Sequence, residues 1–310
     1  MTSVRQQDHH QVPSTNDNCH VPHTIESLEE SQIAIVGLGL MGGSLAGGLR
    51  HRCRSVVGVA RRPDSIAVAL ERGLIDHGTT SLSEGVSQSN VVVLATPVRV
   101  ILQQIAEIGP LLPAECLLLD LGSTKTRIVQ AMAELPDHVQ PLGGHPMCGK
   151  EMSGIEAAEP NIYRGATFIL TPLPRTSEQA LRLGRELVEA VGSRPLVISA
   201  ERQDFLVGTV SHLPYLMACA LVATADATTS TDPAAWKIVA GGYRDTTRVA
   251  GSDVTMMTDI LLTNRDEVLA AVNVFQRQID RLAQLVESGD GEQMRDALNQ
   301  IRQERLRMYP

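Results

Sequence analysis

The chain has 310 residues, of which 43% are hydrophobic and 20% charged, a balance typical of globular proteins and large enough for two domains. Its formal net charge of -8 argues against a nucleic-acid partner or an anionic membrane surface. The five cysteines stand singly and no apolar stretch reaches the roughly 20 residues of a membrane span, so we expect a cytoplasmic protein without a metal site, a disulfide framework or a transmembrane helix.

The first segment, residues 1–31, is polar and holds only scattered apolar residues. It contains four histidines (His9, His10, His20 and His23) among Gln, Ser, Asn and Asp. We interpret it as a disordered tail. Metal binding by the histidines is the less favoured alternative.

From Ile33 onward, short aliphatic runs alternate with stretches that suit helices. Apolar runs of this length are typical of strands buried on both faces. The predicted strands are 33–37, 55–60, 90–97, 116–122, 138–144, 166–172 and 194–199, and the predicted helices between them include 64–72, 98–108, 124–134 and 177–191. This alternation predicts an α/β domain over 32–199, a Rossmann-type doubly wound and mostly parallel sheet.

The first predicted strand runs directly into "GLGLMG", where three glycines follow the G-x-G-x-x-G pattern. In this position, between a strand and a helix, the pattern predicts a dinucleotide site. Gly37 allows the tight turn, Gly39 lets the backbone approach the pyrophosphate, and Gly42 lets the helix pack closely on the strand. Leu40 and Met41, between the last two glycines, belong to the same phosphate-binding turn.

The second predicted strand ends in "VVGVARRP", without the carboxylate that usually binds the adenosine ribose of NAD. Arg61 and Arg62 stand there instead and would bind a 2'-phosphate, so NADP is the favoured cofactor and NAD the alternative. The two arginines can also be read as solvated loop residues. Thr96, at the end of another strand, is a candidate hydrogen-bonding partner of the cofactor or a simple turn cap.

Two further segments fall at the carboxyl ends of predicted strands, where ligands bind in open α/β sheets. "LGSTKTRI" brings Ser123 to the start of a helix, and "LGGHPMCGKEMSG" carries His145 just after the strand 138–144. Because this run is rich in glycine, we expect it to be irregular, with Pro146 fixing the backbone that presents His145. A neutral imidazole there would accept a hydroxyl proton as hydride leaves the same carbon. Cys148 is read as a small buried residue.

After residue 200 the strand signals stop and apolar residues recur at helical spacing. Val268, Val272, Phe275, Ile279, Leu282 and Leu285 mark one face of a long helix that starts near Asp266. We therefore predict an all-helical domain over 200–310, which buries its apolar stripes internally and against a second copy in a homodimer. The cleft between the two domains is the predicted place of the chemistry.

Together these segments resemble the prephenate and arogenate dehydrogenases of tyrosine biosynthesis. The resemblance runs from about Ile33 to Ile260, through "GLGLMGGSLA", "LGSTK", "GGHPMCGKEMSG", "YRGATFILTP", "VSHLPY" and "GGYRDTTRVAGSD". It implies a small-molecule substrate that undergoes oxidative decarboxylation: hydride passes from the ring carbon that bears the hydroxyl to NAD(P)+, the ring carboxylate leaves as carbon dioxide, and the ring becomes aromatic. The expected substrate is prephenate, with arogenate as the alternative.

The resemblance also implies roles for individual residues. His145 matches the histidine that polarises the ring hydroxyl, and Ser123 matches the serine that bridges hydroxyl, histidine and nicotinamide. Arg248 matches the arginine that holds a substrate carboxylate, its alternative being an ion pair with a helix carboxylate such as Asp204.

The segment "SHLPY" departs from the family pattern. Many prephenate-using members carry histidine where this chain has Tyr215, near the substrate side chain, so the segment leaves substrate choice open. Ser211 is assigned to substrate binding in the same segment, and His212 is read as a buried structural histidine.

Two other functions fit parts of the sequence. A β-hydroxyacid dehydrogenase would share the two-domain plan but places a catalytic lysine on the interdomain helix, and residues 200–227 contain no lysine. A non-catalytic NADP sensor would keep the glycine turn without needing His145, Ser123 and Arg248 together.

Overall fold

The computed structural model describes residues 27–308 of the chain. The predicted tail therefore lies mostly outside the described residues, but its last part does not. Leu28 is buried in the core and its amide donates to Glu186 Oε2 at 3.3 Å, while Ser31 is buried as well. The prediction of a tail was wrong for residues 27–31, because the single apolar side chain of Leu28 anchors them to the sheet domain.

The first part of the described chain forms one eight-stranded sheet in the order β3-β2-β1-β4-β5-β6-β7-β8. Its strands are β1 Gln32–Val36, β2 Ser55–Val59, β3 His77–Thr79, β4 Val91–Leu94, β5 Leu117–Asp120, β6 Gln140–Pro146, β7 Thr167–Pro172 and β8 Arg194–Val197. All neighbouring pairs are parallel except β6 with β7, so the predicted doubly wound, mostly parallel sheet is confirmed. The short edge strand β3 was missed because His77–Thr79 is too brief to show a period.

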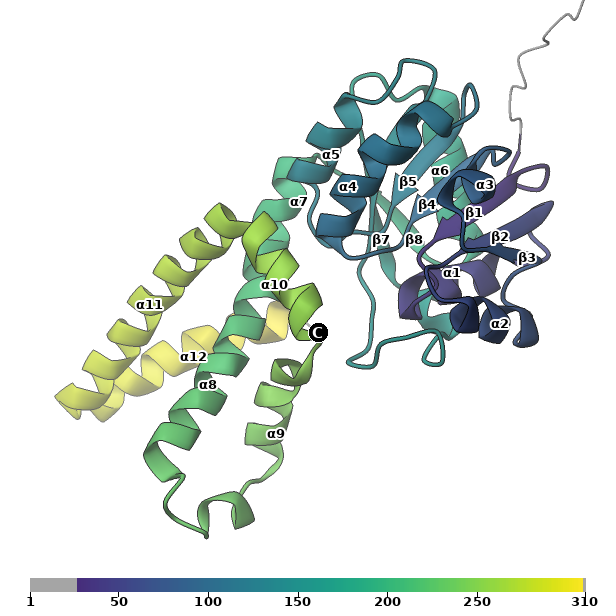
Figure 1. Ribbon diagram of the computed structural model, residues 1–310. Coiled ribbons are helices and arrows are strands. Elements are labelled where there is room, and N and C mark those ends of the chain that lie inside the picture. The colour runs from purple at the N-terminus through teal and green to yellow at the C-terminus, as the bar shows by residue number, and fades with distance from the viewer. Residues whose placement is uncertain (1–26, 309–310) are drawn as a thin grey trace, which may run out of the picture.

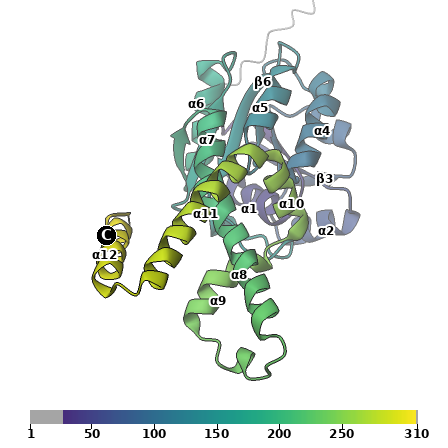
Figure 2. The same cartoon turned by 90° about the vertical axis from the view of Figure 1, so that its left-hand side faces the viewer.

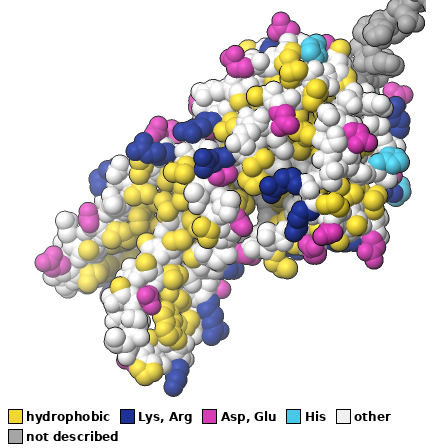
Figure 3. All heavy atoms as spheres, viewed as in Figure 1, with side chains coloured by type: hydrophobic (Ala, Val, Ile, Leu, Met, Phe, Trp, Pro, Cys, Tyr) yellow, Lys and Arg dark blue, Asp and Glu magenta, His cyan; other side chains and the backbone are white. Residues whose placement is uncertain are grey.

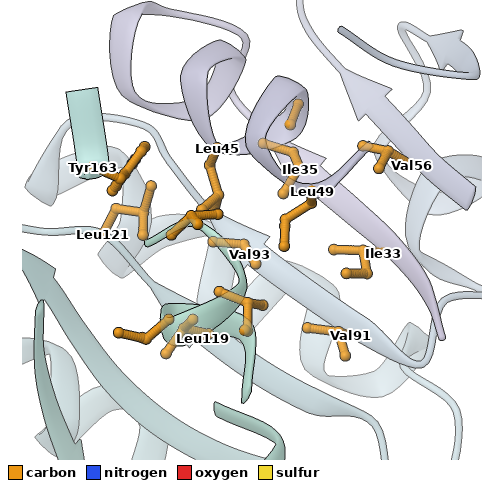
Figure 4. Packing of buried hydrophobic residues seen from close by; sticks show 14 of the residues in the cluster. Ile33, Ile35, Leu45, Leu49, Val56, Val91, Val93, Leu119, Leu121 and Tyr163 are labelled. Carbon is orange, nitrogen blue, oxygen red and sulfur yellow. The ribbon is translucent and has the colours of Figure 1, made fainter. Parts of the chain in front are cut away.

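Helices cover both faces of this sheet (Figure 1). They are α1 Leu40–Leu49, α2 Pro63–Glu71, α3 Leu82–Val86, α4 Val98–Ile108, α5 Thr126–Ala133 and α6 Glu178–Ala190. Alternate residues of β1 point to opposite faces: Ile33 and Ile35 pack with α1 and α6, whereas Ala34 and Val36 pack with α4 and α5. Figure 4 shows the first of these two cores, where Leu45 and Leu49 of α1 lie over the central strands.

Beyond β8 the described chain is helical, as expected. The helices are α7 Ala200–Val207, α8 Leu213–Thr229, α9 Gly241–Thr247, α10 Val254–Thr263, α11 Arg265–Ser288 and α12 Gly291–Met308. A π-helical turn, Gly208–His212, joins α7 to α8, so that the two run on as one rod from the sheet domain into the helical region (Figure 2).

This rod, Ala200–Thr229, is long and apolar enough to cross a membrane by length and composition, with a mean hydropathy of 1.7 over its most apolar window. The expectation that no stretch of the chain would reach that length was therefore wrong. It counted unbroken apolar runs, whereas polar residues interrupt this rod but leave its average hydropathy high, because leucine and valine recur through it. A helix at the core or interface of a non-membrane protein meets the same criteria, and 22% of this window is buried within the single chain.

The apolar stripe predicted on the last long helix is real but mostly uncovered in the single chain. Of α11, only Val268 and Ala271 are buried, and Ile279 is 47% exposed. α12 extends beyond α11 with none of its residues buried. Hydrophobic side chains accordingly gather over the surface of the helical region in Figure 3. Apolar surface of this extent is typical of an interface.

Arg175, in the turn after β7, ties the end of α5 to the sheet. Its guanidinium donates to four backbone oxygens, those of Met132, Leu135, Pro136 and Val139, at 2.8–3.4 Å. We expect Arg175→Ala to lower the free energy of unfolding by about 2–4 kcal/mol, because these oxygens would lose their charged donor. Urea denaturation followed by circular dichroism measures the change. The matched control is Arg182→Ala on the exposed face of α6, and an equal loss in both variants would contradict the assignment.

Candidate functional site

The glycine turn between β1 and α1 has the shape that a dinucleotide requires. Gly37 adopts a φ of +106°, and a Cβ on Gly42 would lie 1.9 Å from the Gly37 carbonyl oxygen. A Cβ on Gly39 would meet nothing within 4 Å, so the turn leaves open space before α1. Gly39 caps this helix without a side-chain hydrogen bond, and the amides of Leu40 and Met41 have no partner inside the helix. These residues fit a pyrophosphate at the N-terminus of α1.

The predicted contacts to the rest of the cofactor lie at the same edge of the sheet. Arg61 and Arg62 follow β2, the parallel neighbour of β1, and both are exposed; Arg62 also donates to Ser65 Oγ at 3.3 Å. Thr96 follows β4, and its methyl group would lie 2.8 Å from a Cβ on Gly37. Its hydroxyl donates to the side chain of Gln104 in α4, with Oε1 at 2.7 Å.

His145 lies inside β6, paired with Ile169 of β7, rather than in a loop after the strand. The strand predicted at 138–144 continues through two more residues, so the expectation that the glycine-rich run would be irregular was wrong at residues 145 and 146. The reason is close packing: a Cβ on Gly144 would lie 2.4 Å from the Asp120 carbonyl oxygen, and one on Gly143 would lie 3.2 Å from Lys125 Cδ. Glycine is needed here so that β6 can approach its neighbours, and not to break the strand.

The imidazole of His145 is buried, 8% exposed, and its Nδ1 has no hydrogen-bonding partner among the described residues. Burial lowers its pKa to about 3, helped by the positive charges of Lys125 and of His212 when protonated. The ring is therefore neutral at physiological pH. Because Nδ1 is itself buried, a ligand at this edge of the sheet would meet Nε2, which accepts a proton when Nδ1 carries the hydrogen of the neutral ring.

Behind His145 lies a buried ion pair that the sequence interpretation missed. Lys125 Nζ bonds Asp120 Oδ2, and both side chains are 0% exposed. Burial raises the pKa of Asp120 and lowers that of Lys125, while their mutual attraction opposes both shifts. The available signal was the spacing in "DLGSTK", which sets an aspartate at a strand end five residues before a lysine.

The segment that carries Ser123 is held from the helical domain. Asp204 of α7 accepts from the amides of Lys125 and Thr126 at 2.7 and 2.8 Å, and so caps α5 across the domain boundary. Gln203 Nε2 donates to the Ser123 carbonyl oxygen at 3.3 Å. On the other side, the hydroxyls of Thr124 and Thr263 are 2.8 Å apart. The position of Ser123 thus depends on both domains.

The residues predicted to bind substrate lie on the helical domain. Arg248 forms an ion pair with Glu151, in the loop that follows His145, and not with Asp204 as the alternative interpretation had it. Ser211 is exposed in the π-helical turn, and Tyr215 is half-buried in the first turn of α8. Figure 3 shows the surface hollowed between the sheet domain and the helical region, with Lys and Arg side chains along the rim.

The surroundings of His212 and Cys148 favour structural roles over catalytic ones for both side chains. His212 is buried, its pKa is lowered to about 4 by burial, and its Nδ1 lies 3.1 Å from Asn264 Nδ2, as expected of a structural histidine. Cys148 is half-buried rather than buried, and burial raises the pKa of its thiol to about 11, which disfavours a thiolate nucleophile. Within residues 27–308 no group of three or more His, Cys, Asp or Glu side chains is placed to hold a metal ion.

Comparison with known proteins shows which family the chain resembles. A family model described as the nucleotide-binding domain of prephenate dehydrogenase matches residues 45–197, and one described as its dimerization domain matches residues 199–300. The prephenate dehydrogenase of Bacillus subtilis is 35% identical over 268 residues, covering 84% of this chain and 72% of that protein.

Solved structures agree with the sequence matches. The prephenate dehydrogenase of Aquifex aeolicus, in complex with hydroxyphenyl propionate and NAD+, has a TM-score of 0.84 and 33% identity, covering 91% of this chain and 99% of that one. The arogenate dehydrogenase of Synechocystis has a TM-score of 0.78 and 29% identity, covering 89% and 99%. This chain therefore belongs to the prephenate dehydrogenase family of oxidoreductases.

Proposed function

We propose that the protein catalyses the oxidative decarboxylation of prephenate, with NADP+ preferred over NAD+. The observation that carries the proposal is the neutral, buried and unpartnered imidazole of His145 at the sheet edge that also bears the glycine turn. The family membership supports the reaction class, and the relatives that are prephenate dehydrogenases support the choice of substrate.

In the proposed reaction the side chains of the protein handle the proton, and the hydride passes to the cofactor. The glycine turn and the N-terminus of α1 would hold the dinucleotide, which would supply the hydride acceptor for the ring carbon that carries the hydroxyl. His145 accepts the hydroxyl proton as the C–H bond at that carbon breaks, which leaves a ketone on the ring. The bond to the ring carboxylate then breaks, carbon dioxide leaves, and the electron pair passes through the ring to the ketone oxygen, which takes the proton back from His145 to give a phenol. Ser123, at the end of the neighbouring strand segment, orients the hydroxyl toward His145. Aromatisation of the ring drives the sequence forward.

Arg248 is assigned to substrate binding and orientation. A guanidinium suits a planar carboxylate, and in the described structure it already holds one, that of Glu151. A substrate carboxylate would take the place of Glu151 at this arginine. A tight grip on the departing carboxylate would stabilise the ground state and oppose its loss, so the role of Arg248 is to bind and not to drive decarboxylation.

The alternative substrate is arogenate, which carries an amino acid where prephenate carries a keto acid. Tyr215 and Ser211 are assigned to this end of the substrate, and a phenol can accept from an ammonium or donate to a keto acid. The Synechocystis relative is named an arogenate dehydrogenase, which keeps this reading open. A β-hydroxyacid dehydrogenase is less favoured because residues 200–227 contain no lysine.

We further propose a homodimer formed through the helical domain. Its support is the exposed apolar surface of α8, α11 and α12, together with the description of the matching family model as a dimerization domain. Pairing with a second copy would cover side chains such as Ile279 and Ile301.

Replacing the proposed base tests the reaction directly. We expect His145→Asn to lower kcat with prephenate by about 10³-fold while the KM values change little, because a positioned general base contributes on the order of 10²–10⁴-fold. Initial rates of NADPH formation at 340 nm measure the loss. His138→Asn is the matched control, since His138 precedes the opposite end of the same strand. Full activity of the His145 variant would contradict the assignment.

The pH dependence follows from the environment of His145. The ordinary pKa of histidine, 6.5, is lowered to about 3 by burial, so the free enzyme keeps this base neutral between pH 5 and 8. We expect kcat/KM for prephenate to stay flat as the pH falls from 8 to 5, since this ratio reports groups of the free enzyme. A decline that follows a pKa near 6.5 and disappears in His145→Asn would show instead that the ring is solvated.

Cofactor preference tests the arginine pair. We expect the double substitution Arg61→Ala and Arg62→Ala to raise the KM for NADP+ by more than about 10-fold and to leave that for NAD+ nearly unchanged, because only NADP+ offers a phosphate to these side chains. Initial rates with each cofactor provide the comparison. Arg52→Ala, an exposed arginine before β2, is the matched control. Wild-type enzyme that prefers NAD+ would refute the NADP assignment.

A further inference from the structure

One buried carboxylate bonds both backbone segments that carry the proposed catalytic residues. Asp120, the last residue of β5, accepts from the amide of Gly122 through Oδ2 at 2.7 Å and from the amide of Gly144 through Oδ1 at 3.0 Å. Gly122 immediately precedes Ser123, and Gly144 immediately precedes His145. The two oxygens of a single side chain therefore link one residue of each pair.

The Asp120 side chain joins the two segments just beyond the last backbone pair between β5 and β6. The backbone pairing of β5 with β6 ends at Leu119 and Leu142. The amide of Gly144, two residues farther along β6, donates instead to the side chain of Asp120. The approach is close: a Cβ on Gly144 would lie 2.4 Å from the Asp120 carbonyl oxygen, and one on Gly122 would lie 2.9 Å from its Oδ2. Both catalytic segments are thus packed against the same residue.

The third donor to this carboxylate is Lys125 Nζ, which bonds Oδ2. Three donors and no acceptor face Asp120, which suits a carboxylate and does not suit an amide, because the NH2 of an asparagine would meet one of these donors. The backbone amide of Lys125 is itself held by Asp204 at 2.7 Å, so the counterion cannot follow a displaced carboxylate freely.

We propose that Asp120 is a positioning residue that sets the placement of Ser123 relative to His145, with Lys125 as its counterion. The proposal rests on the proposed function for its kinetic test. Asp120 contacts neither substrate nor cofactor in this proposal; it acts through the two amides. Loss of the carboxylate would release Gly144 and Gly122 independently and move the two catalytic side chains apart.

The test compares two variants with wild type. Asp120→Asn keeps the shape of the side chain but turns an NH2 toward one of the three donors. The double variant Asp120→Asn and Lys125→Met removes both buried charges, and because no unpaired charge remains it is expected to fold even if the single variant does not. In each folded variant we expect kcat to fall by about 100-fold, the loss typical of a misplacement of about 1 Å, with KM values within about 3-fold of wild type.

A second measurement needs neither cofactor nor substrate. In ligand-free protein labelled with 15N-histidine, the ring nitrogens of His145 are identified by their absence from His145→Asn, and we expect both Asp120 variants to shift them. Asp76→Asn is the matched control: Asp76 also accepts from a backbone amide, that of Val56 at 2.8 Å, and pairs with Arg50, but at the opposite end of the sheet. It should leave kcat and the His145 signals as in wild type.

The outcomes separate the two proposals. A 100-fold loss in kcat with unchanged KM and shifted His145 signals supports the positioning role. Wild-type kcat in a folded Asp120 variant overturns it, and so does a loss in kcat that leaves the His145 signals in place. If wild-type protein oxidises neither prephenate nor arogenate, the proposed function fails, and the His145 signals alone then decide whether Asp120 sets the position of that ring.

Discussion

A lysine without access to water remains charged only beside a charge of opposite sign, and the Lys125–Asp120 pair imposes this constraint on the carboxyl edge of the sheet. Much of the surrounding structure follows from it. Gly143 must be small because the lysine chain passes beneath it, and Gly144 must be small because β6 packs directly on Asp120. Burial keeps His145 neutral, and Lys125 adds to the effect because a second positive charge beside it is unfavourable.

Several polar contacts cross the domain boundary beside the site. Asp204, Gln203 and Thr263 reach from the helical domain to backbone or hydroxyl groups at residues 123–126, and Asp259 accepts from the Arg99 amide at 3.2 Å. Hydrogen bonds fix direction more strictly than apolar contacts do. The helical domain that carries Arg248 and Tyr215 is thereby held in register with the sheet domain that carries Ser123 and His145.

The sequence was sufficient wherever one local pattern decided the structure. Continuous aliphatic runs predicted β1, β4 and β5, because strands buried on both faces need little else, and the three glycines predicted the turn before α1. It failed where a distant neighbour decided. The glycines at 143 and 144 look like loop residues until Asp120 and Lys125 are placed beside them, and no local signal pairs Asp204 with the start of α5 or Glu151 with Arg248. The apolar character of the rod 200–229 was missed because only its mean hydropathy is high, whereas polar residues interrupt every run of apolar ones.

The helix α12 has none of its residues buried within its own chain, although it spans Gly291–Met308. An isolated helix of that length is marginally stable in water, so packing outside the single chain has to supply most of its free energy. In the homodimer that we propose, the helical domain would therefore complete its folding only when two chains meet. Protein concentration would then enter the folding equilibrium itself, and dilution would loosen the C-terminal helices before it affected the sheet.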